Sequence, residues 1–302
     1  MNGILDDLKN VFRKPDNALL RLIIINVIVF LGIEVLVTTL GFFRSAYANL
    51  IANLLRDQVL LPGQLGEFIF RPWTILSYAF GHAGLGHIFW NMLFLYWFGL
   101  IITEYLGSKR LISLYVLGAL AGGLSFLMLN LITQRADVLI GASGAVYAVM
   151  VGAATLTPNY TFHLLFIGPV RIKYIAAVYI VLSYIGLRGL NTGGDLAHLA
   201  GALIGYMFIV QLKKGTDLGK WIHDFMEFVS NLFQRKPKMR VSYNKSKSKV
   251  TANTAYRNST KSNGENMPGQ DEIDAILDKI SASGYESLTK EEKQKLFRAS
   301  KS

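Results

Sequence analysis

Residues 111–132 read LISLYVLGALAGGLSFLMLNLI and contain no charged side chain. A helix that spans a membrane needs about 20 mainly apolar residues. Five further apolar stretches occur in the chain, near 18–41, 85–103, 143–157, 174–187 and 196–212. The long ones show no alternation of period two, which argues against a β-barrel. We therefore expect an all-α polytopic membrane protein with six transmembrane helices.

Composition and charge agree with this interpretation. The 302 residues are 52% hydrophobic, with a mean hydropathy of +0.35 and a net charge of +11. With six spans both termini lie on one side, which also carries most of the Lys and Arg, so the positive-inside rule places both termini in the cytoplasm. No transit peptide precedes the first stretch, and we expect a bacterial plasma (inner) membrane, with an organelle membrane as the alternative. The partner expected from this pattern is the lipid bilayer, not nucleic acid.

The sequence divides into five segments. We expect a cytoplasmic N-terminal lead (1–17), a six-helix domain (18–212) with a long external loop (42–72), a basic amphipathic juxtamembrane segment (213–240), a disordered linker (241–270) and a small cytoplasmic helical hairpin (271–302).

Two patterns in the C-terminal part indicate helices. One helical face carries Trp221, Phe225, Phe228 and Leu232 and is followed by a basic run, which is typical of a helix lying on an anionic membrane surface. An extension of the sixth helix is the alternative. Thr289 and Glu292 form a capping-box pattern that opens a second tail helix. We expect this tail to dock a cytoplasmic partner.

Ser143 is a polar residue at the start of an apolar stretch, in Gly141-Ala142-Ser143-Gly144. A helix N-cap is the simple explanation. The glycines Gly141 and Gly144, however, let a substrate approach the backbone closely and leave the N–H groups of the helix start open to an oxyanion. The helix that follows is shorter than the membrane is thick, so Ser143 can lie below the surface, in a water-filled cavity. A nucleophilic serine is the second interpretation.

A nucleophilic serine needs a base, and His198 is the best candidate. Gly201 and Gly205, which follow it, form a small-residue surface that lets another helix approach closely. Packing of this surface against the helix of Ser143 would bring the two side chains together. Tyr147 lies four residues after Ser143 on the same face, where it can contact the imidazole.

His82, His87 and Asn91 lie at the start of the second stretch. His87 and Asn91 are four residues apart and project from one face, so they can donate to a common oxyanion. A metal site from His82, His87 and His198 is the alternative, but His82 and His87 lack the i, i+4 spacing of a helical zinc pair. With no cysteine in the chain, disulfides and Cys-based metal sites are excluded.

Several motifs together resemble those of the rhomboid intramembrane serine proteases. They are GASGAVYA (141–148), AHLAGALIG (197–205), the residues from Arg71-Pro-Trp-Thr to His87-Ile-Phe-Trp-Asn91, and Glu104-Tyr-Leu-Gly-Ser-Lys-Arg110. The resemblance covers about residues 70–212 in the family's order and spacing. It implies the six-helix rhomboid bundle and a catalytic dyad without an acidic third member.

The resemblance also implies roles for single residues. Ser143 and His198 would form the dyad, His87 and Asn91 would complete the oxyanion hole, and Tyr147 would stack on the histidine. Asp195 is expected to be a loop or N-cap residue, with a third catalytic member as the alternative. The implied reaction is cleavage of transmembrane segments without cofactor or metal. A rhomboid-like protein that only binds or escorts such segments is the alternative; a transporter is a more distant one.

Overall fold

The computed structural model describes residue 11 and residues 17–134, 137–165, 167–233 and 270–299. The chain forms two compact units, 1–237 and 238–302, which are described separately. The predicted disordered linker 241–270 lies outside the described residues except for its last position.

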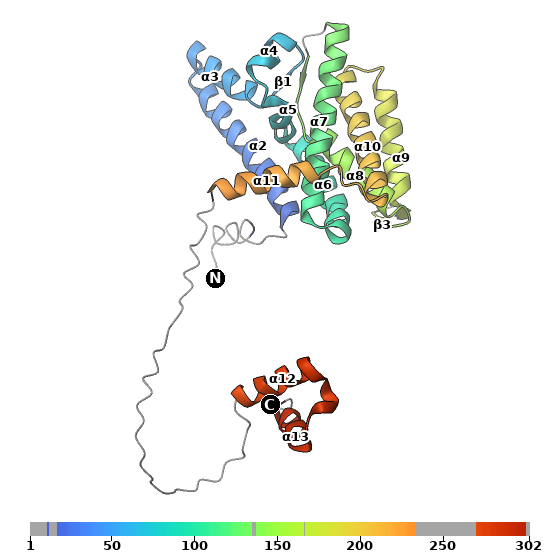
Figure 1. The fold of residues 1–302 in the computed structure, drawn as a ribbon. Coiled ribbons are helices and arrows are strands. Elements are labelled where there is room, and N and C mark those ends of the chain that lie inside the picture. Colours follow the sequence, from blue (N-terminus) through green and yellow to red (C-terminus); the bar gives the residue numbers. More distant parts are fainter. Residues whose placement is uncertain (1–10, 12–16, 135–136, 166, 234–269, 300–302) are drawn as a thin grey trace, which may run out of the picture. The chain divides into compact units, whose positions relative to one another are not determined.

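Four helices of the first unit are long and apolar enough to cross a membrane (Figure 1). They are α2 (Ala18–Phe42), α6 (Leu85–Leu106), α7 (Ser108–Thr133) and α10 (Thr192–Lys213). Two further apolar helices are shorter, α8 (Ser143–Leu156) and α9 (Ile172–Gly186). At about 1.5 Å per residue α8 is only about 21 Å long. The fold is therefore a helical membrane bundle, and the count of six spans stays a prediction.

The long segment 42–72 is more ordered than the loop expected from the sequence. It contains helix α3 (Ala46–Asp57), strand β1 (Leu61–Pro62) and helix α4 (Leu65–Phe70). Two short elements follow, α5 (Thr74–Ser77) and the 3-10 helix η1 (Tyr78–Phe80). β1 pairs antiparallel with β2 (Val138–Leu139), which immediately precedes α8. This pairing ties the segment to the start of α8.

Helix α8 lies at the centre of the bundle, packed against α6, α7, α9 and α10 (Figure 1). Small residues permit this packing. A Cβ atom at Gly201 would overlap the carbonyl oxygen of Gly144, and one at Gly205 would overlap that of Ala148. The backbones of α8 and α10 are therefore in direct contact, as small-residue surfaces allow in membrane helices. A hairpin of β3 (Thr161–Leu164) and β4 (Gly168–Arg171) connects α8 to α9.

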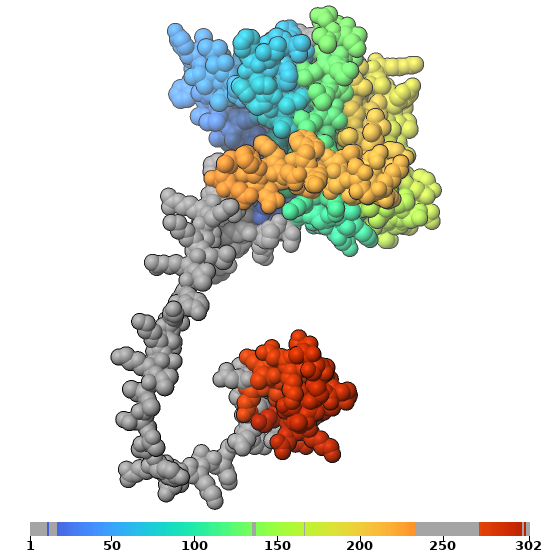
Figure 2. Space-filling model, viewed as in Figure 1, coloured from blue at the N-terminus to red at the C-terminus, as the bar shows by residue number. Residues whose placement is uncertain are grey.

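Helix α11 (Lys220–Phe233) is a separate element, so the alternative of an extended sixth helix is wrong. The chain turns after α10 at Gly215, whose φ of +89° favours glycine. α11 then crosses the front of the bundle and covers part of it (Figure 2). Its His223 Nε2 lies 2.7 Å from Ser113 Oγ on α7, and Ile222 is buried. The opposite face of α11 exposes Trp221, Phe225, Phe228 and Leu232.

The second unit contains α12 (Gln270–Ser283), η2 (Tyr285–Ser287) and α13 (Lys290–Ala299). The two hydrogen bonds of a capping box open α13: the Thr289 amide donates to Glu292 Oε2 at 2.8 Å, and the Glu292 amide donates to Thr289 Oγ1 at 3.3 Å. Lys279 of α12 contacts the Glu292 carboxylate at 2.9 Å and so joins the two helices.

Candidate active site

Ser143 is the first residue of α8, and its hydroxyl points to α10. Ser143 Oγ lies 2.7 Å from His198 Nε2. The N-cap interpretation of Ser143 is wrong, because Ala142 occupies that position and no side chain caps the helix. The contact between α8 and α10 at Gly144 and Gly201 sets this distance. Gly144 directly follows Ser143, and Gly201 lies one turn beyond His198.

Side chains of α8 and α9 also contact the His198 ring. The rings of Tyr147 and His198 are stacked, with centroids 4.4 Å apart and 7° between their planes. His198 Nδ1 lies 3.2 Å from Ser183 Oγ, and Ser183 Oγ lies 2.9 Å from the Tyr147 hydroxyl. The Tyr147 hydroxyl in turn donates to the carbonyl oxygen of Tyr179 at 3.4 Å. The imidazole is thus fixed by a ring contact and by a hydrogen bond.

Sequence reasoning missed Ser183. This residue is 2% exposed and lies on α9, where most neighbours in the sequence are apolar. A polar side chain inside a membrane helix is itself a signal of function, and that rule applied to 174–187 would have found it.

Asp195 lies in the first turn of α10, so the expected loop or N-cap position is wrong. A carboxylate is favourable there because the helix N-terminus carries partial positive charge. Asp195 Oδ1 is 3.7 Å from His198 Nδ1, too long for a hydrogen bond. The Ser183 hydroxyl, at 3.2 Å, is the closer partner of this nitrogen.

His87 and Asn91 line the same cavity as Ser143 and His198, which has a volume of about 420 Å³. The Ala83 amide donates to His87 Nδ1 at 3.3 Å, so a neutral His87 carries its proton on Nε2. Gly141, with a φ of +129°, lies against that nitrogen: a Cβ there would come within 2.8 Å of it. Asn91 Nδ2 donates to the His87 carbonyl at 2.8 Å and keeps a second N–H.

His82 precedes α6 rather than lying in it, and it does not line the Ser143 cavity. Its ring meets the ring of His87 edge-on, with centroids 5.2 Å apart. Among the described residues, no group of three or more His, Cys, Asp or Glu is placed to hold a metal ion. The structure thus brings Ser143, His198, His87, Asn91 and Tyr147 together and leaves His82 outside.

The comparisons with known proteins match the part of the chain that carries this site. The family profile of the rhomboid domain matches residues 70–214. Residues 70–214 belong to the rhomboid family. The rhomboid domain includes α6 to α10, and the chain is an integral membrane protein. A second profile, of a family of unknown function, matches residues 260–302.

Relatives of the rhomboid domain come from several eukaryotes. "RHOMBOID-like protein 12, mitochondrial" of Arabidopsis thaliana is 32% identical over 160 residues, 48% of each chain. "Rhomboid protein 1, mitochondrial" of Saccharomyces cerevisiae is 29% identical, covering 50% of this chain and 45% of the relative. "Rhomboid-like protease 3" of Toxoplasma gondii is 28% identical, covering 50% and 56%. This chain therefore spans about half the length of these relatives. Two of these names include the word "mitochondrial", and no name supports the expected bacterial plasma membrane.

Proposed function

We propose that this chain is an intramembrane serine endopeptidase that cleaves transmembrane segments of other membrane proteins. The observation that carries the proposal is the 2.7 Å contact between Ser143 Oγ and His198 Nε2 in a cavity between membrane helices. A hydroxyl bonded to an imidazole that a third group orients is the general arrangement of an activated serine nucleophile. The names of the relatives agree, since one is called a protease.

The hydrogen bonds around His198 favour the protonation state that such a base needs. The Tyr179 carbonyl can only accept a hydrogen bond. The Tyr147 hydroxyl therefore donates to Tyr179 O and accepts from the Ser183 hydroxyl. The Ser183 hydroxyl in turn accepts from His198 Nδ1–H. Nε2 of the neutral imidazole is then free to accept the Ser143 proton.

The reaction follows from these positions. Ser143 Oγ attacks the carbonyl carbon of the scissile peptide while His198 Nε2 takes its proton. The carbonyl oxygen becomes an oxyanion, which His87 Nε2–H, the second N–H of Asn91 and the N–H groups at the start of α8 stabilise. The C–N bond then breaks, and His198 gives its proton to the leaving amine. Water, deprotonated by His198, hydrolyses the acyl-enzyme and frees Ser143.

A fluorescent fluorophosphonate tests the proposal without a known substrate, because it phosphonylates only an activated serine. We expect the purified full-length protein to be labelled, and Ser143→Ala and His198→Ala to be unlabelled. Ser125→Ala is the matched control: Ser125 is a half-buried serine of α7 bonded to its own helix at Gly122 O. It should be labelled like the wild type.

Two results would contradict this function. Full labelling of Ser143→Ala would assign the nucleophile to another serine. A folded wild type that stays unlabelled would favour a protein that binds transmembrane segments without cleaving them.

A further inference from the structure

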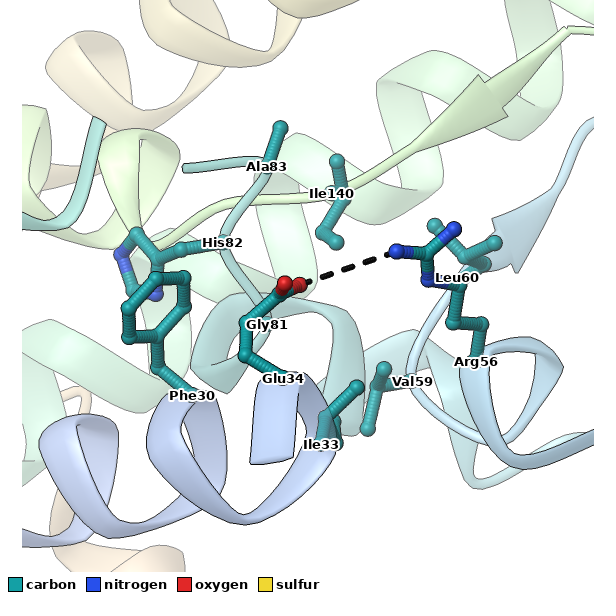
Figure 3. Close-up of a pocket in the computed structure, with 10 residues that line it drawn as sticks. All are labelled: Phe30, Ile33, Glu34, Arg56, Val59, Leu60, Gly81, His82, Ala83 and Ile140. Carbon is teal, nitrogen blue, oxygen red and sulfur yellow. Dashed lines mark ion pairs between the residues drawn. The ribbon is translucent and has the colours of Figure 1, made fainter. Parts of the chain in front are cut away.

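A second cavity, lined in part by Gly81, His82 and Ala83, adjoins the cavity of Ser143; Figure 3 shows its lining residues. Its volume is about 260 Å³. Its polar side chains come from three separate elements: Glu34 from α2, Arg56 from α3 and His82 from the turn before α6. Ala83 and Ile140 line both this cavity and the Ser143 cavity. The two sites thus share a wall.

The polar groups of this cavity have unused capacity for hydrogen bonds. Arg56 Nη2 and Glu34 Oε1 are 3.8 Å apart, which is an ion pair but too long for a hydrogen bond. His82 is 4% exposed, and neither ring nitrogen has a hydrogen-bond partner within the described part of the chain. Both ring nitrogens of His82 are buried and do not open onto the cavity, so Glu34 and Arg56 are the groups that can contact a ligand there.

The charges of the cavity specify the kind of ligand. A simple anion would be attracted by Arg56 but repelled by the Glu34 carboxylate. A simple cation would be attracted by Glu34 but repelled by Arg56. A ligand with one anionic and one cationic group satisfies both residues. The two charged groups are adjacent, as the ion pair drawn in Figure 3 shows.

An apolar groove continues from this cavity between α2 and α6. The two share Phe30, and no acidic or basic residue lines the groove. Its volume is about 820 Å³. Along α6 it runs from Leu85, where the helix begins, to Tyr96, a distance of about 16 Å. That is about half of the roughly 30 Å hydrocarbon core, the depth of one leaflet.

We propose that the cavity and the groove together bind one phospholipid with a zwitterionic phosphate–ammonium headgroup. Arg56 holds the phosphate with its planar guanidinium. Glu34 accepts hydrogen bonds from the ammonium group. One acyl chain lies in the α2–α6 groove. A primary ammonium, as in phosphatidylethanolamine, fits better than a quaternary one because Glu34 requires N–H donors.

Native mass spectrometry of the delipidated full-length protein tests the site independently of protease activity. Phosphatidylethanolamine, phosphatidylcholine and phosphatidylglycerol with identical acyl chains are added separately. We expect one tightly retained phosphatidylethanolamine, with about tenfold weaker retention of each of the other two. Equal retention of all three lipids would overturn the proposal.

Three variants test the contacts to the lipid headgroup and to the acyl chain separately. Arg56→Gln should weaken phosphatidylethanolamine retention about tenfold, and Glu34→Gln should remove the preference for ethanolamine over choline. Gly86→Phe should block the groove, because a Cβ at Gly86 meets no atom within 4 Å and the new ring is free to extend. Arg44→Gln, which removes an exposed charge between α2 and α3, is the matched control and should retain lipid like the wild type.

The folding of each variant is checked, because a misfolded protein would also lose lipid. Thermal unfolding in micelles is measured for each, and a variant that does not fold is set aside in favour of the other two. Wild-type retention by all folded site variants would overturn the proposal. The protease proposal fails on fluorophosphonate labelling and the lipid proposal fails on retention, so the two results are distinguishable.

Discussion

The imidazole of His198 and the phenol ring of Tyr147 lie parallel, 4.4 Å apart at their centroids. Tyr147 also bonds Ser183, the partner of His198 Nδ1. One side chain thus holds the imidazole by its face and supports the group that binds its edge. These two contacts can be removed separately.

Substitutions of Tyr147 should therefore have graded effects. Tyr147→Phe keeps the ring contact and loses the hydrogen bonds to Ser183 and to the Tyr179 carbonyl. The bond to Ser183, worth about 1 kcal/mol, supports the group that orients His198, so the rate of fluorophosphonate labelling should fall about fivefold. Tyr147→Ala also removes the ring contact and leaves a cavity, and large-to-small changes of this kind cost about 3–5 kcal/mol of stability. Labelling kinetics and thermal unfolding measure the two effects. Equal labelling rates for both variants would show that the ring contact has no role.

Ser183 and Asp195 are rival partners of His198 Nδ1, and the distances favour Ser183. We expect Ser183→Ala to slow labelling about tenfold, because a buried N–H loses its acceptor at a cost of about 1–3 kcal/mol. Asp195→Asn should change the rate less than threefold, since its oxygen is beyond hydrogen-bond distance. The pH dependence of labelling is recorded for both, because loss of the orienting partner also changes the pH profile. The reverse order of effects would make Asp195 the orienting group.

Gly201 and Gly205 should tolerate no side chain. An added methyl group at either would overlap the backbone of α8, and overpacking of this kind costs about 1–3 kcal/mol. Gly201→Ala and Gly205→Ala should lower the unfolding temperature in micelles. Gly32→Ala on α2 is the control, because nothing lies within 4 Å of its added Cβ. An unfolding temperature of Gly201→Ala equal to that of the control would disprove the close packing of α8 and α10.

The capping box of α13 should respond to acid. The hydrogen bond from the Thr289 amide, together with the Lys279 ammonium, lowers the pKa of Glu292 to about 2 from its ordinary value of 4.5. Because the folded-state pKa is the lower one, the stabilisation is complete above about pH 4.5. It is lost as the pH falls toward 2.

Carbon-detected NMR of the glutamate carboxyl groups in the full-length protein measures this shift, with Glu292→Gln for assignment. Titration of Glu292 near its ordinary value would show that the capping box does not form in solution.

The sequence predicted the meeting of Ser143 and His198 because both lie beside small residues whose spacing only close helix packing explains. The signal for Ser183 was present but weak, because a serine in a membrane helix can equally bond the carbonyl one turn back. The position of Asp195 was misjudged because α10 begins at Thr192, ahead of its apolar stretch. Structure within 42–72 was also missed, since β1 owes its form to pairing with β2, and the paired residues Leu61 and Leu139 are 78 positions apart in the sequence.

The turn at Gly81–Ala83 has a consequence beyond positioning His87. Ala83 lines both the Ser143 cavity and the cavity of Glu34 and Arg56, and its amide donates a hydrogen bond to the ring of His87. If both proposals are correct, residues 81–83 contact the bound lipid and, through the Ala83 amide, hold the histidine that stabilises the oxyanion. The rate of cleavage would then depend on the lipid composition of the surrounding membrane, so that the bilayer would regulate the enzyme as well as surround it.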